Sequence, residues 1–230
     1  MRVLLLGHGR MGQLVESLAP SYGATVAGVL DEHSGDRAIA DGTFGKVDVA
    51  IDFTLADAVP RNLPQLAERG INVVIGTTGW QAHEAVMREV ASKAGIGVLA
   101  ASNFSLGMNV FQLVIEEAAR RFAAHEEFGA WIHEAHHAMK KDAPSGTAMT
   151  LKKGMEGAGY TRPIDVSSAR AGSIPGTHTI GFDGPSETIE LTHTVRDRAV
   201  FARGALVAAK WLVGKRGWFS MRDMLEGSRV

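Results

Sequence analysis

The segment Val3-Leu4-Leu5-Leu6-Gly7-His8-Gly9-Arg10-Met11-Gly12 places a short apolar run directly before a glycine-rich loop. A continuous apolar run is typical of a strand buried on both faces of a parallel sheet. Residues 13–18 continue as a helix with Leu14, Val15 and Leu18 on one side. A strand, a GxGxxG loop and a helix in this order predict a dinucleotide-binding domain. Its glycines make the tight turn, admit the pyrophosphate and let the helix pack on the strand.

A second apolar run, Val26–Leu30, ends at Asp31. An acidic residue about 20 positions beyond the glycine motif is where the adenosine ribose hydroxyls are bound. Its carboxylate would repel a 2′-phosphate, and the following Glu32 and His33 include no arginine to offset that charge. Local charge therefore favours NADH over NADPH. Arg10, inside the glycine loop, could still reach a 2′-phosphate, so the sequence is compatible with either NADH or NADPH.

Strands and helices alternate through the first hundred residues. This pattern predicts an α/β fold with a Rossmann-type, doubly wound parallel sheet, whose ligands lie at the carboxyl ends of the strands. Small polar residues follow two of these strands, and they are either ligand contacts or simple turn and cap residues. The expected strands are 47–54, 71–75 and 97–101, the expected helices are about 56–69 and 81–94, and residues 32–46 form a shortened connection.

After about residue 106 the pattern changes. A long amphipathic helix over 110–123 leads into a strand over 128–134, and Ser145 begins a helix that runs to about residue 155. Three further strands without intervening helices predict a second α+β domain with an antiparallel or mixed sheet. A final apolar helix is expected to return to the first domain. The expected strands are 164–171, 178–182 and 187–195, and the final helix is 201–212; the dinucleotide-binding domain would comprise 1–106 and about 203–230, and the second domain 107–202.

The segment Glu134–Thr147 contains two adjacent imidazoles, two ammonium groups and a Pro-Ser-Gly-Thr turn at a helix start. Histidine exchanges protons near neutral pH, and the backbone N–H groups of a helix N-terminus attract anions. Together they predict a pocket in which a small acidic substrate undergoes proton transfer. The alternative is a strand running into a capped helix with solvated charges. The spacing is not HExxH and Ser145 is not in GxSxG, so we expect no metal site and no serine nucleophile.

Composition excludes several classes of partner. The formal net charge is -1 over 230 residues, so no basic surface for nucleic acid or an anionic membrane is expected. The absence of cysteine removes disulfides, thiolate nucleophiles and Cys-ligated zinc. No apolar run reaches the roughly 20 residues of a membrane span, and the first residues do not read as a signal peptide. We therefore expect a cytoplasmic protein.

The segment Glu134-Ala135-His136-His137-Ala138-Met139-Lys140-Lys141-Asp142-Ala143-Pro144-Ser145-Gly146-Thr147-Ala148 resembles the E-x-H-H-x-x-K-x-D-x-P-S-G-T-A signature of the 4-hydroxy-tetrahydrodipicolinate (dihydrodipicolinate) reductase family. The resemblance covers nearly the whole chain. Other matching segments are Gly9–Gly12, Val49–Thr54, Gly76–Gly79, Ala101–Ser105, Arg170–Gly172, Gly176–His178, Glu187–His193 and Phe201–Ala205. Two departures are a glycine loop one residue shorter than the family's G-x-x-G-R-M-G and a short connection after Asp31.

This resemblance implies roles for individual residues. His136 would donate and accept the proton, Lys140 would be a second proton donor and carboxylate partner, His137 would contact the substrate, and Gly146 and Thr147 would bind the other carboxylate. The second domain would carry the substrate and form a homotetramer through its sheet. The implied cofactor-binding residues are Gly7, His8, Gly9, Arg10, Met11, Gly12, Asp31, Gly76, Thr77, Thr78, Ala101, Ser102, Asn103 and Phe104.

The activity implied by the resemblance is NAD(P)H-dependent reduction of 4-hydroxy-tetrahydrodipicolinate to tetrahydrodipicolinate in lysine and diaminopimelate biosynthesis. Two alternatives remain at this point. One is another Rossmann reductase acting on a small dicarboxylate or imine. The other is a non-catalytic protein that senses nicotinamide cofactors, which would bind the cofactor without turnover.

Overall fold

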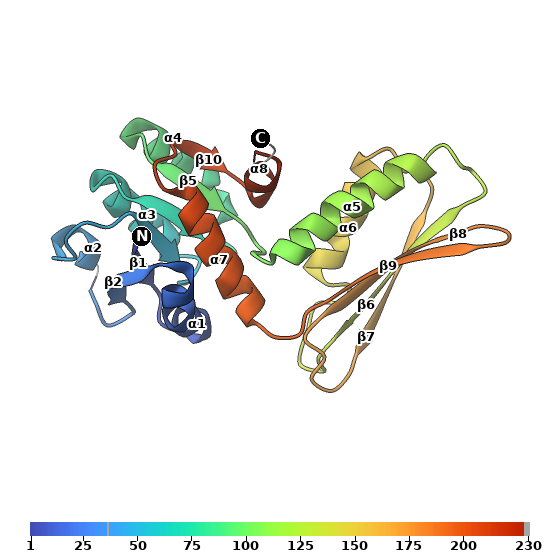
Figure 1. The fold of residues 1–230 in the computed structure, drawn as a ribbon, viewed down its shortest axis with the longest axis horizontal. Helices are drawn as coiled ribbons and strands as arrows, with labels where there is room; N and C mark the ends of the chain where they lie inside the picture. The colour runs from blue at the N-terminus through green and yellow to red at the C-terminus, as the bar shows by residue number, and fades with distance from the viewer. Residues whose placement is uncertain (36, 228–230) are drawn as a thin grey trace. The chain divides into compact units, whose positions relative to one another are not determined.

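The computed structural model describes residues 1–35 and 37–227, which form two compact units (Figure 1). The first unit comprises Met1–Leu106 and the chain from Ala199 onward, and the second comprises Gly107–Arg198. The chain returns to the first unit slightly before the expected position near residue 203, because the final long helix already begins at Ala199. No helix within the described residues is long and apolar enough to cross a membrane.

The first unit is built on a six-stranded parallel sheet with the order β10-β5-β4-β3-β1-β2. Its central strands are buried on both faces, as their continuous apolar sequence predicts. The doubly wound parallel sheet expected from the sequence is therefore confirmed. The strands are β1 (Arg2–Leu6), β2 (Thr25–Leu30), β3 (Val49–Asp52), β4 (Asn72–Ile75), β5 (Gly97–Ala100) and β10 (Gly217–Phe219).

Helices cover both faces of this sheet because alternate strand residues point to opposite sides. Val3 and Leu5 of β1 pack with one group of helices, whereas Leu4 and Leu6 pack with the other. Gly204 lets α7 approach the backbone at Phe104 closely, since a Cβ there would lie 1.6 Å from the carbonyl oxygen of Phe104. The first group is α1 (Arg10–Leu18), η1 (Ala19–Tyr22), α7 (Ala199–Leu212) and α8 (Met221–Glu226); the second is α2 (Ala38–Asp41), α3 (Val59–Glu68) and α4 (Glu84–Ala94), the last preceded by η2 (Gln81–His83).

Three local features differ from the sequence-based prediction. The shortened connection after β2 contains the four-residue helix α2, whose buried Ile39 joins the core. Strand β10 and helix α8 were not predicted, because a three-residue strand carries almost no periodicity. β10 is the edge strand beside β5, and α8 begins with a capping box between Ser220 and Asp223.

The second unit is a four-stranded mixed sheet with the order β7-β6-β8-β9, in which β6 pairs parallel with β7 and antiparallel with β8. Two helices cover one of its faces and enclose a core that includes Ile132, Ile180 and Phe182 (Figure 1). The elements are α5 (Leu106–Phe122), β6 (Gly129–His136), α6 (Gly146–Gly157), β7 (Ile164–Arg170), β8 (Thr177–Asp183) and β9 (Thr188–Thr194).

Strand β6 is longer than expected and ends at His136. The residues Ile132, Glu134 and His136 therefore share the helix-covered face. Ser145 caps α6 by accepting a hydrogen bond from the N–H of Ala148, as predicted.

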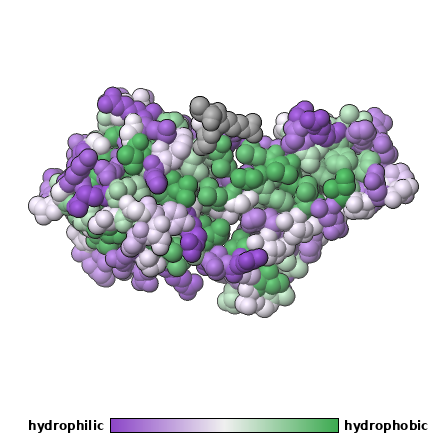
Figure 2. Space-filling model, in the orientation of Figure 1, coloured by the Kyte–Doolittle hydropathy of each residue, from purple (hydrophilic) through white to green (hydrophobic). Residues whose placement is uncertain are grey.

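Apolar side chains gather over α5 in Figure 2. Val110 and Val114 of this helix are exposed.

Candidate active site

The glycine loop joins β1 to α1, and its glycines differ in the space around them. Gly7 adopts a φ of +87°, and a Cβ on it would lie 2.5 Å from the carbonyl oxygen of Phe53. A Cβ on Gly12 would lie 2.0 Å from the carbonyl oxygen of Gly7, whereas one on Gly9 would meet nothing within 4 Å. Gly7 and Gly12 are thus required by packing, and Gly9 opens onto free space. No side chain caps the start of α1 at Gly9, which leaves that helix end open to an anion.

A cavity of about 570 Å³ lies beside this loop at the carboxyl ends of β1, β2 and β3. Gly7, His8, Gly9 and Asp31 line it. One carboxylate oxygen of Asp31 accepts hydrogen bonds from the N–H of His33 and the hydroxyl of Ser34. These two bonds, the His33 N–H first, hold the pKa of Asp31 below its usual value, so its carboxylate is charged at neutral pH. Additional lining residues include Phe53, Thr54, Asp57, Arg61 and Asn62.

A second cavity of about 480 Å³ lies at the carboxyl ends of β4 and β5. Thr77, Ala101 and Ser102 line it together with Trp218 and Phe219. The hydroxyl of Thr77 is held by Asp52 Oδ1 at 3.0 Å. Both cavities lie at the carboxyl edge of the sheet, and residues of the predicted cofactor-binding segments line them.

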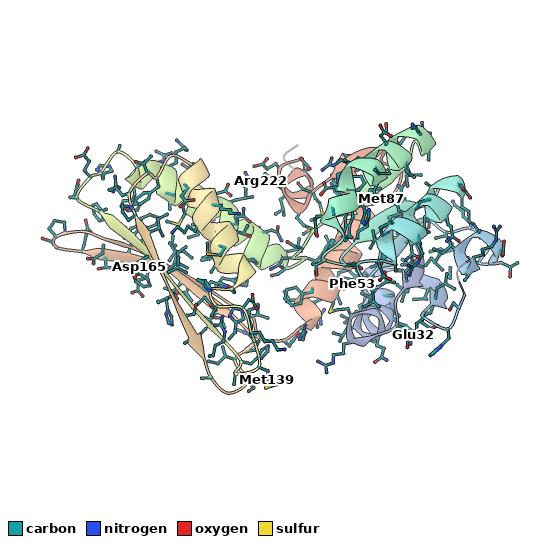
Figure 3. The ribbon with its side chains drawn as sticks, turned by 180° about the vertical axis from the view of Figure 1, so that it is seen from behind. Glu32, Phe53, Met87, Met139, Asp165 and Arg222 are labelled. Atoms are coloured by element: carbon teal, nitrogen blue, oxygen red, sulfur yellow. The ribbon has the colours of Figure 1, made fainter. Side chains whose placement is uncertain are left out.

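The side chain of Phe104, a predicted cofactor-binding residue, is buried in the core rather than exposed in these cavities. Phe104 is 2% exposed and packs edge-on against Phe53 in the core, with ring centroids 6.2 Å apart. Its apolar ring is stabilised there by burial, so only its backbone remains for ligand contacts. Figure 3 shows Phe53 at the end of β3, close to this core.

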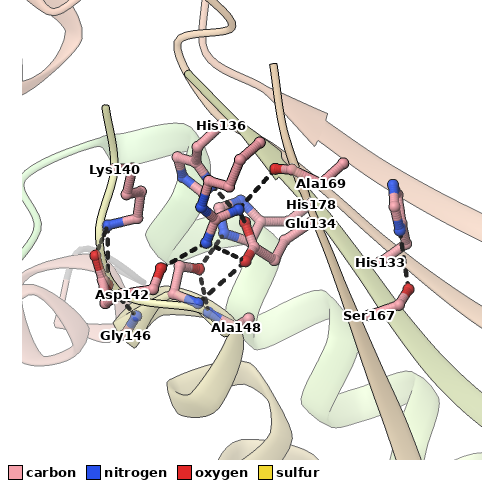
Figure 4. Close-up of polar contacts among 12 residues, drawn as sticks. His133, Glu134, His136, Lys140, Asp142, Gly146, Ala148, Ser167, Ala169 and His178 are labelled. Atoms are coloured by element: carbon pink, nitrogen blue, oxygen red, sulfur yellow. Dashed lines mark hydrogen bonds and ion pairs between the residues drawn. The ribbon is translucent and has the colours of Figure 1, made fainter. Parts of the chain in front are cut away.

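The second unit contains a buried cluster of charged and imidazole side chains at the end of β6 (Figure 4). Glu134 is fully buried, and its Oε2 lies 2.5 Å from His136 Nδ1. Arg170 holds both carboxylate oxygens, at 2.9 Å to Oε2 and 2.7 Å to Oε1. The N–H of Ser145 donates to Oε1 at 3.2 Å. The Glu134 carboxylate therefore links β6, the start of α6 and β7.

Hydrogen bonding decides the charge of Glu134. Burial alone would raise its pKa, but the hydrogen bonds from Arg170, Ser168, His136 and Ser145 outweigh burial and lower the pKa to about 2. Glu134 is therefore an anion at neutral pH. A buried anion is stable only when it is paired and hydrogen-bonded, as this one is.

His178 of β8 completes the cluster from the other side. Its ring is 3% exposed and lies 5.1 Å from the ring of His136, nearly perpendicular to it. Its Nε2 is 3.2 Å from the hydroxyl oxygen of Ser145. Burial, and next the charge of His136, lower the pKa of His178 to about 4. His178 is therefore neutral at pH 7, and burial likewise lowers the pKa of His193 beside it.

Strand register explains why these residues meet. His136 is paired with Arg170 on β7, and Glu134 is paired with His178 on β8. Paired residues of neighbouring strands point to the same face of a sheet. Arg170 and His178 were missed from the sequence because this register is not encoded locally. Two signals were available: both residues lie in segments that match the family, and each is a charged or imidazole residue near one end of a predicted strand.

Lys140 and the start of α6 lie beside this cluster, and both donate hydrogen bonds to Asp142. The Lys140 ammonium contacts both oxygens of Asp142, at 2.8 and 2.9 Å. Asp142 Oδ2 also accepts the N–H of Gly146 at 3.3 Å. The hydrogen bond from Lys140 is the main cause that keeps the pKa of Asp142 below its usual value. A carboxylate of the protein thus occupies donors that the sequence assigned to substrate.

The predicted residues of the second unit share this region. His136, Lys140 and Gly146 appear together in Figure 4, whereas His133 bonds Ser167 apart from the cluster. Thr147 lies in the first turn of α6. His137 follows directly after the end of β6, and its carbonyl accepts the N–H of Lys140 at 3.1 Å. No group of three or more His, Cys, Asp or Glu side chains suited to a metal ion occurs in the described part of the chain.

A Rossmann sheet with an open glycine loop, in one chain with a buried cluster of a carboxylate, a guanidinium and imidazoles, is typical of nicotinamide-dependent oxidoreductases. Comparison with known proteins gives the family. The models of dihydrodipicolinate reductase match residues 1–104 for its N-terminus and residues 107–225 for its C-terminus. The chain belongs to the dihydrodipicolinate reductase family, as the sequence motifs indicated.

Individual relatives agree with this membership. The chain is 37% identical to the 4-hydroxy-tetrahydrodipicolinate reductase of Christiangramia forsetii, over 98% of both chains. It is 37% identical to that of Archaeoglobus fulgidus, over 98% of this chain and 100% of the relative. A dipicolinate-bound dihydrodipicolinate reductase from Paenisporosarcina sp. TG-14 has the same fold, with a TM-score of 0.81 at 21% identity, over 96% of this chain and 97% of that one.

Proposed function

We propose that this enzyme reduces 4-hydroxy-tetrahydrodipicolinate to tetrahydrodipicolinate with loss of water, in lysine and diaminopimelate biosynthesis. The observation that carries the proposal is the cluster of Glu134, His136 and Arg170 beside Lys140 and the start of α6. It combines a group that can give a proton with donors for carboxylates, which is what reduction of a cyclic dicarboxylate requires. The two relatives, both 4-hydroxy-tetrahydrodipicolinate reductases, support the same substrate.

The first unit would hold NADH or NADPH. The free space at Gly9, the uncapped start of α1 and the charged Asp31 fit a dinucleotide. When bound, the reduced nicotinamide supplies a hydride from C4. The proposed cofactor residues are Gly7–Gly12, Asp31, Gly76–Thr78 and Ala101–Phe104.

We infer a preference for NADH from the charge of Asp31. Its carboxylate can accept hydrogen bonds from the ribose hydroxyls and repels a 2′-phosphate. Neighbouring Glu32 adds a second negative charge to the same cavity. Arg10 is exposed at the start of α1 and is the opposing group, because it could bind a 2′-phosphate.

The second unit would bind and protonate the substrate. His136 gives a proton to the ring as electron density develops on it, and Lys140 binds one carboxylate and serves as a second proton donor. The N–H of Gly146 and the hydroxyl of Thr147 bind the other carboxylate, and His137 contacts the substrate. A substrate carboxylate would replace Asp142 on its donors, because Lys140 and Gly146 now bind Asp142.

We further propose that the second unit forms a homotetramer through the open face of its sheet. Threonine pairs cross this face between β8 and β9, with hydroxyl oxygens 3.2 Å apart for Thr177 and Thr194 and 3.0 Å apart for Thr179 and Thr192. A sheet face without covering helices invites pairing with a second copy. Sedimentation equilibrium should give four times the 24.5 kDa chain mass. A monomer mass would contradict this assembly.

A coupled assay tests the activity. The synthase that makes the substrate is added to the enzyme with NADH or NADPH, and absorbance of the reduced cofactor is followed. We expect oxidation that depends on freshly formed substrate, with higher kcat/KM for NADH, in the cytoplasmic pH range. Cofactor binding without oxidation would instead support a sensor, and turnover with other imines or dicarboxylates but not this substrate would support a different reductase.

A further inference from the structure

The contact between Glu134 and His136 fixes which ring nitrogen of His136 is free. The carboxylate has a single orientation, because Arg170 binds both of its oxygens and Ser145 donates to Oε1. Its Oε2 faces His136 Nδ1 at 2.5 Å. An ionised carboxylate only accepts hydrogen bonds, so Nδ1 must carry a proton. The other nitrogen, Nε2, is then the atom that can exchange a proton with a ligand.

We propose that Glu134 is the positioning residue for His136, and that His136 Nε2 is the atom that transfers the proton. The inference rests on the proposed function for its substrate, but the assignment of the two nitrogens does not. In the step itself the Nε2–H bond breaks and a C–H bond forms on the substrate ring. The electron pair of the broken N–H bond stays on Nε2, and the pair for the new C–H bond comes from the substrate ring. The other proton stays on Nδ1, hydrogen-bonded to Glu134, throughout.

Space around His136 supports this assignment. Gly176, which precedes β8, has a φ of +144°, and a Cβ on it would lie 3.1 Å from His136 Nε2. A side chain at this position would therefore crowd Nε2. The missing Cβ keeps this nitrogen open, whereas Nδ1 is closed by Glu134. One ring nitrogen is thus held by the protein and the other is accessible to a ligand, as a proton donor requires.

Arg170 keeps Glu134 in a positioning role. A carboxylate next to an imidazolium could take its proton. His136 would then be a neutral imidazole, which is a much weaker proton donor. The bidentate guanidinium contact favours the ionised carboxylate, as the low pKa of Glu134 near 2 indicates. Glu134 therefore orients the ring through Nδ1 and does not take the proton from it. His178 adds a packing contact from the opposite side without a charge at neutral pH.

The kinetic test uses Glu134→Gln, which preserves size and removes the charge. Its kcat should fall by about 10- to 100-fold, with KM changed less than about threefold, because ring orientation is lost while carboxylate binding persists. The solvent deuterium isotope effect on kcat should rise as proton transfer becomes slower. Glu134→Asp should recover part of kcat. Wild-type kcat and isotope effect in Glu134→Gln would overturn the proposal.

The matched control is Glu117→Gln on α5. Glu117 is also a carboxylate of the second unit that bonds arginines, namely Arg120 and Arg121. Its replacement should leave kcat and the isotope effect unchanged. A variant of Glu134 that merely lowered the folded fraction would lower kcat without changing the isotope effect, and that outcome would also reject a positioning role.

A measurement on the unmodified protein avoids any folding defect. Nitrogen-15 spectra of labelled histidine, assigned by subtraction of a His136→Gln sample, report which ring nitrogen carries the proton. The neutral ring of His136 should carry it on Nδ1. A proton on Nε2 would overturn the proposal even if the enzyme is active. If the coupled assay fails while Nδ1 is protonated, the proposed substrate is wrong and the positioning of His136 stands.

Discussion

The glycine loop of the first unit and the buried cluster of the second are built in opposite ways. The loop makes its ligand site from backbone: Gly9 opens free space and the start of α1 is uncapped. The cluster makes its site from side chains, with Glu134 fully buried among Arg170 and two histidines. A backbone site depends on space, and a side-chain site depends on charge and orientation. Variants that change one property should therefore affect one region and spare the other.

The largest expected effect is on proton transfer. His136→Gln or Lys140→Ala should lower kcat by about 10²-fold or more, because each removes a proposed proton donor. The dissociation constant of the cofactor should stay unchanged, since both residues belong to the other unit. Steady-state kinetics and fluorescence titration measure the two quantities. His133→Gln, on the opposite face of β6, is the control, and near-wild-type kcat in both test variants would reject the assigned roles.

The second effect concerns stability against acid. The pKa of His178 is lowered from 6.5 to about 4 by burial, so the unfolded chain binds more protons between these values. Stability should therefore be lost as pH falls from about 6.5 to 4, by on the order of 1 to 3 kcal/mol. His178→Gln should remove this part of the pH dependence. Calorimetric unfolding at pH 7 and pH 4.5 provides the check, and an identical slope in both proteins would contradict it.

The third effect isolates the backbone site. Gly9→Ala adds a methyl group where the fold has room but a pyrophosphate would lie, so cofactor affinity should fall about tenfold or more at unchanged Tm. Gly157→Ala, which also meets nothing within 4 Å, is the control. Unaltered cofactor affinity in Gly9→Ala would mean that the cofactor is held elsewhere.

A smaller effect concerns the choice of cofactor. Asp31→Ala should lower the ratio of kcat/KM for NADH to that for NADPH by roughly 3- to 10-fold, because repulsion of the 2′-phosphate is lost. Glu32→Ala should change the ratio less, since Glu32 lies one residue beyond the expected ribose contact. An unchanged ratio in Asp31→Ala would shift attention to Arg10 as the residue that sets preference.

The smallest effect concerns Asp142. Asp142→Asn weakens the contact that competes with substrate for Lys140 and Gly146, so KM should fall by about 1.5- to 5-fold, the range of an exposed ion pair. Initial rates at saturating cofactor measure it. A rise in KM would show that Asp142 instead arranges these donors for the substrate.

The same contrast explains what could be predicted from sequence. The parallel sheet, the Gly7–Gly12 loop and the cap at Ser145 were predicted because local spacing encodes them. β10 was missed because three residues show no period, and the burial of the Phe104 ring was not predicted because tertiary packing sets it. Arg170 and His178 were missed because their contacts depend on strand register, which tertiary packing sets.

The most direct test of the two-region account is a pair of binding titrations. Gly9→Ala and Lys140→Ala are each titrated calorimetrically with NADH and with dipicolinate, the dicarboxylate bound by the Paenisporosarcina protein. We expect Gly9→Ala to lose affinity for NADH and keep it for dipicolinate, and Lys140→Ala to lose affinity for dipicolinate and keep it for NADH. Equal loss of both ligands in either variant, or loss of neither, would contradict it.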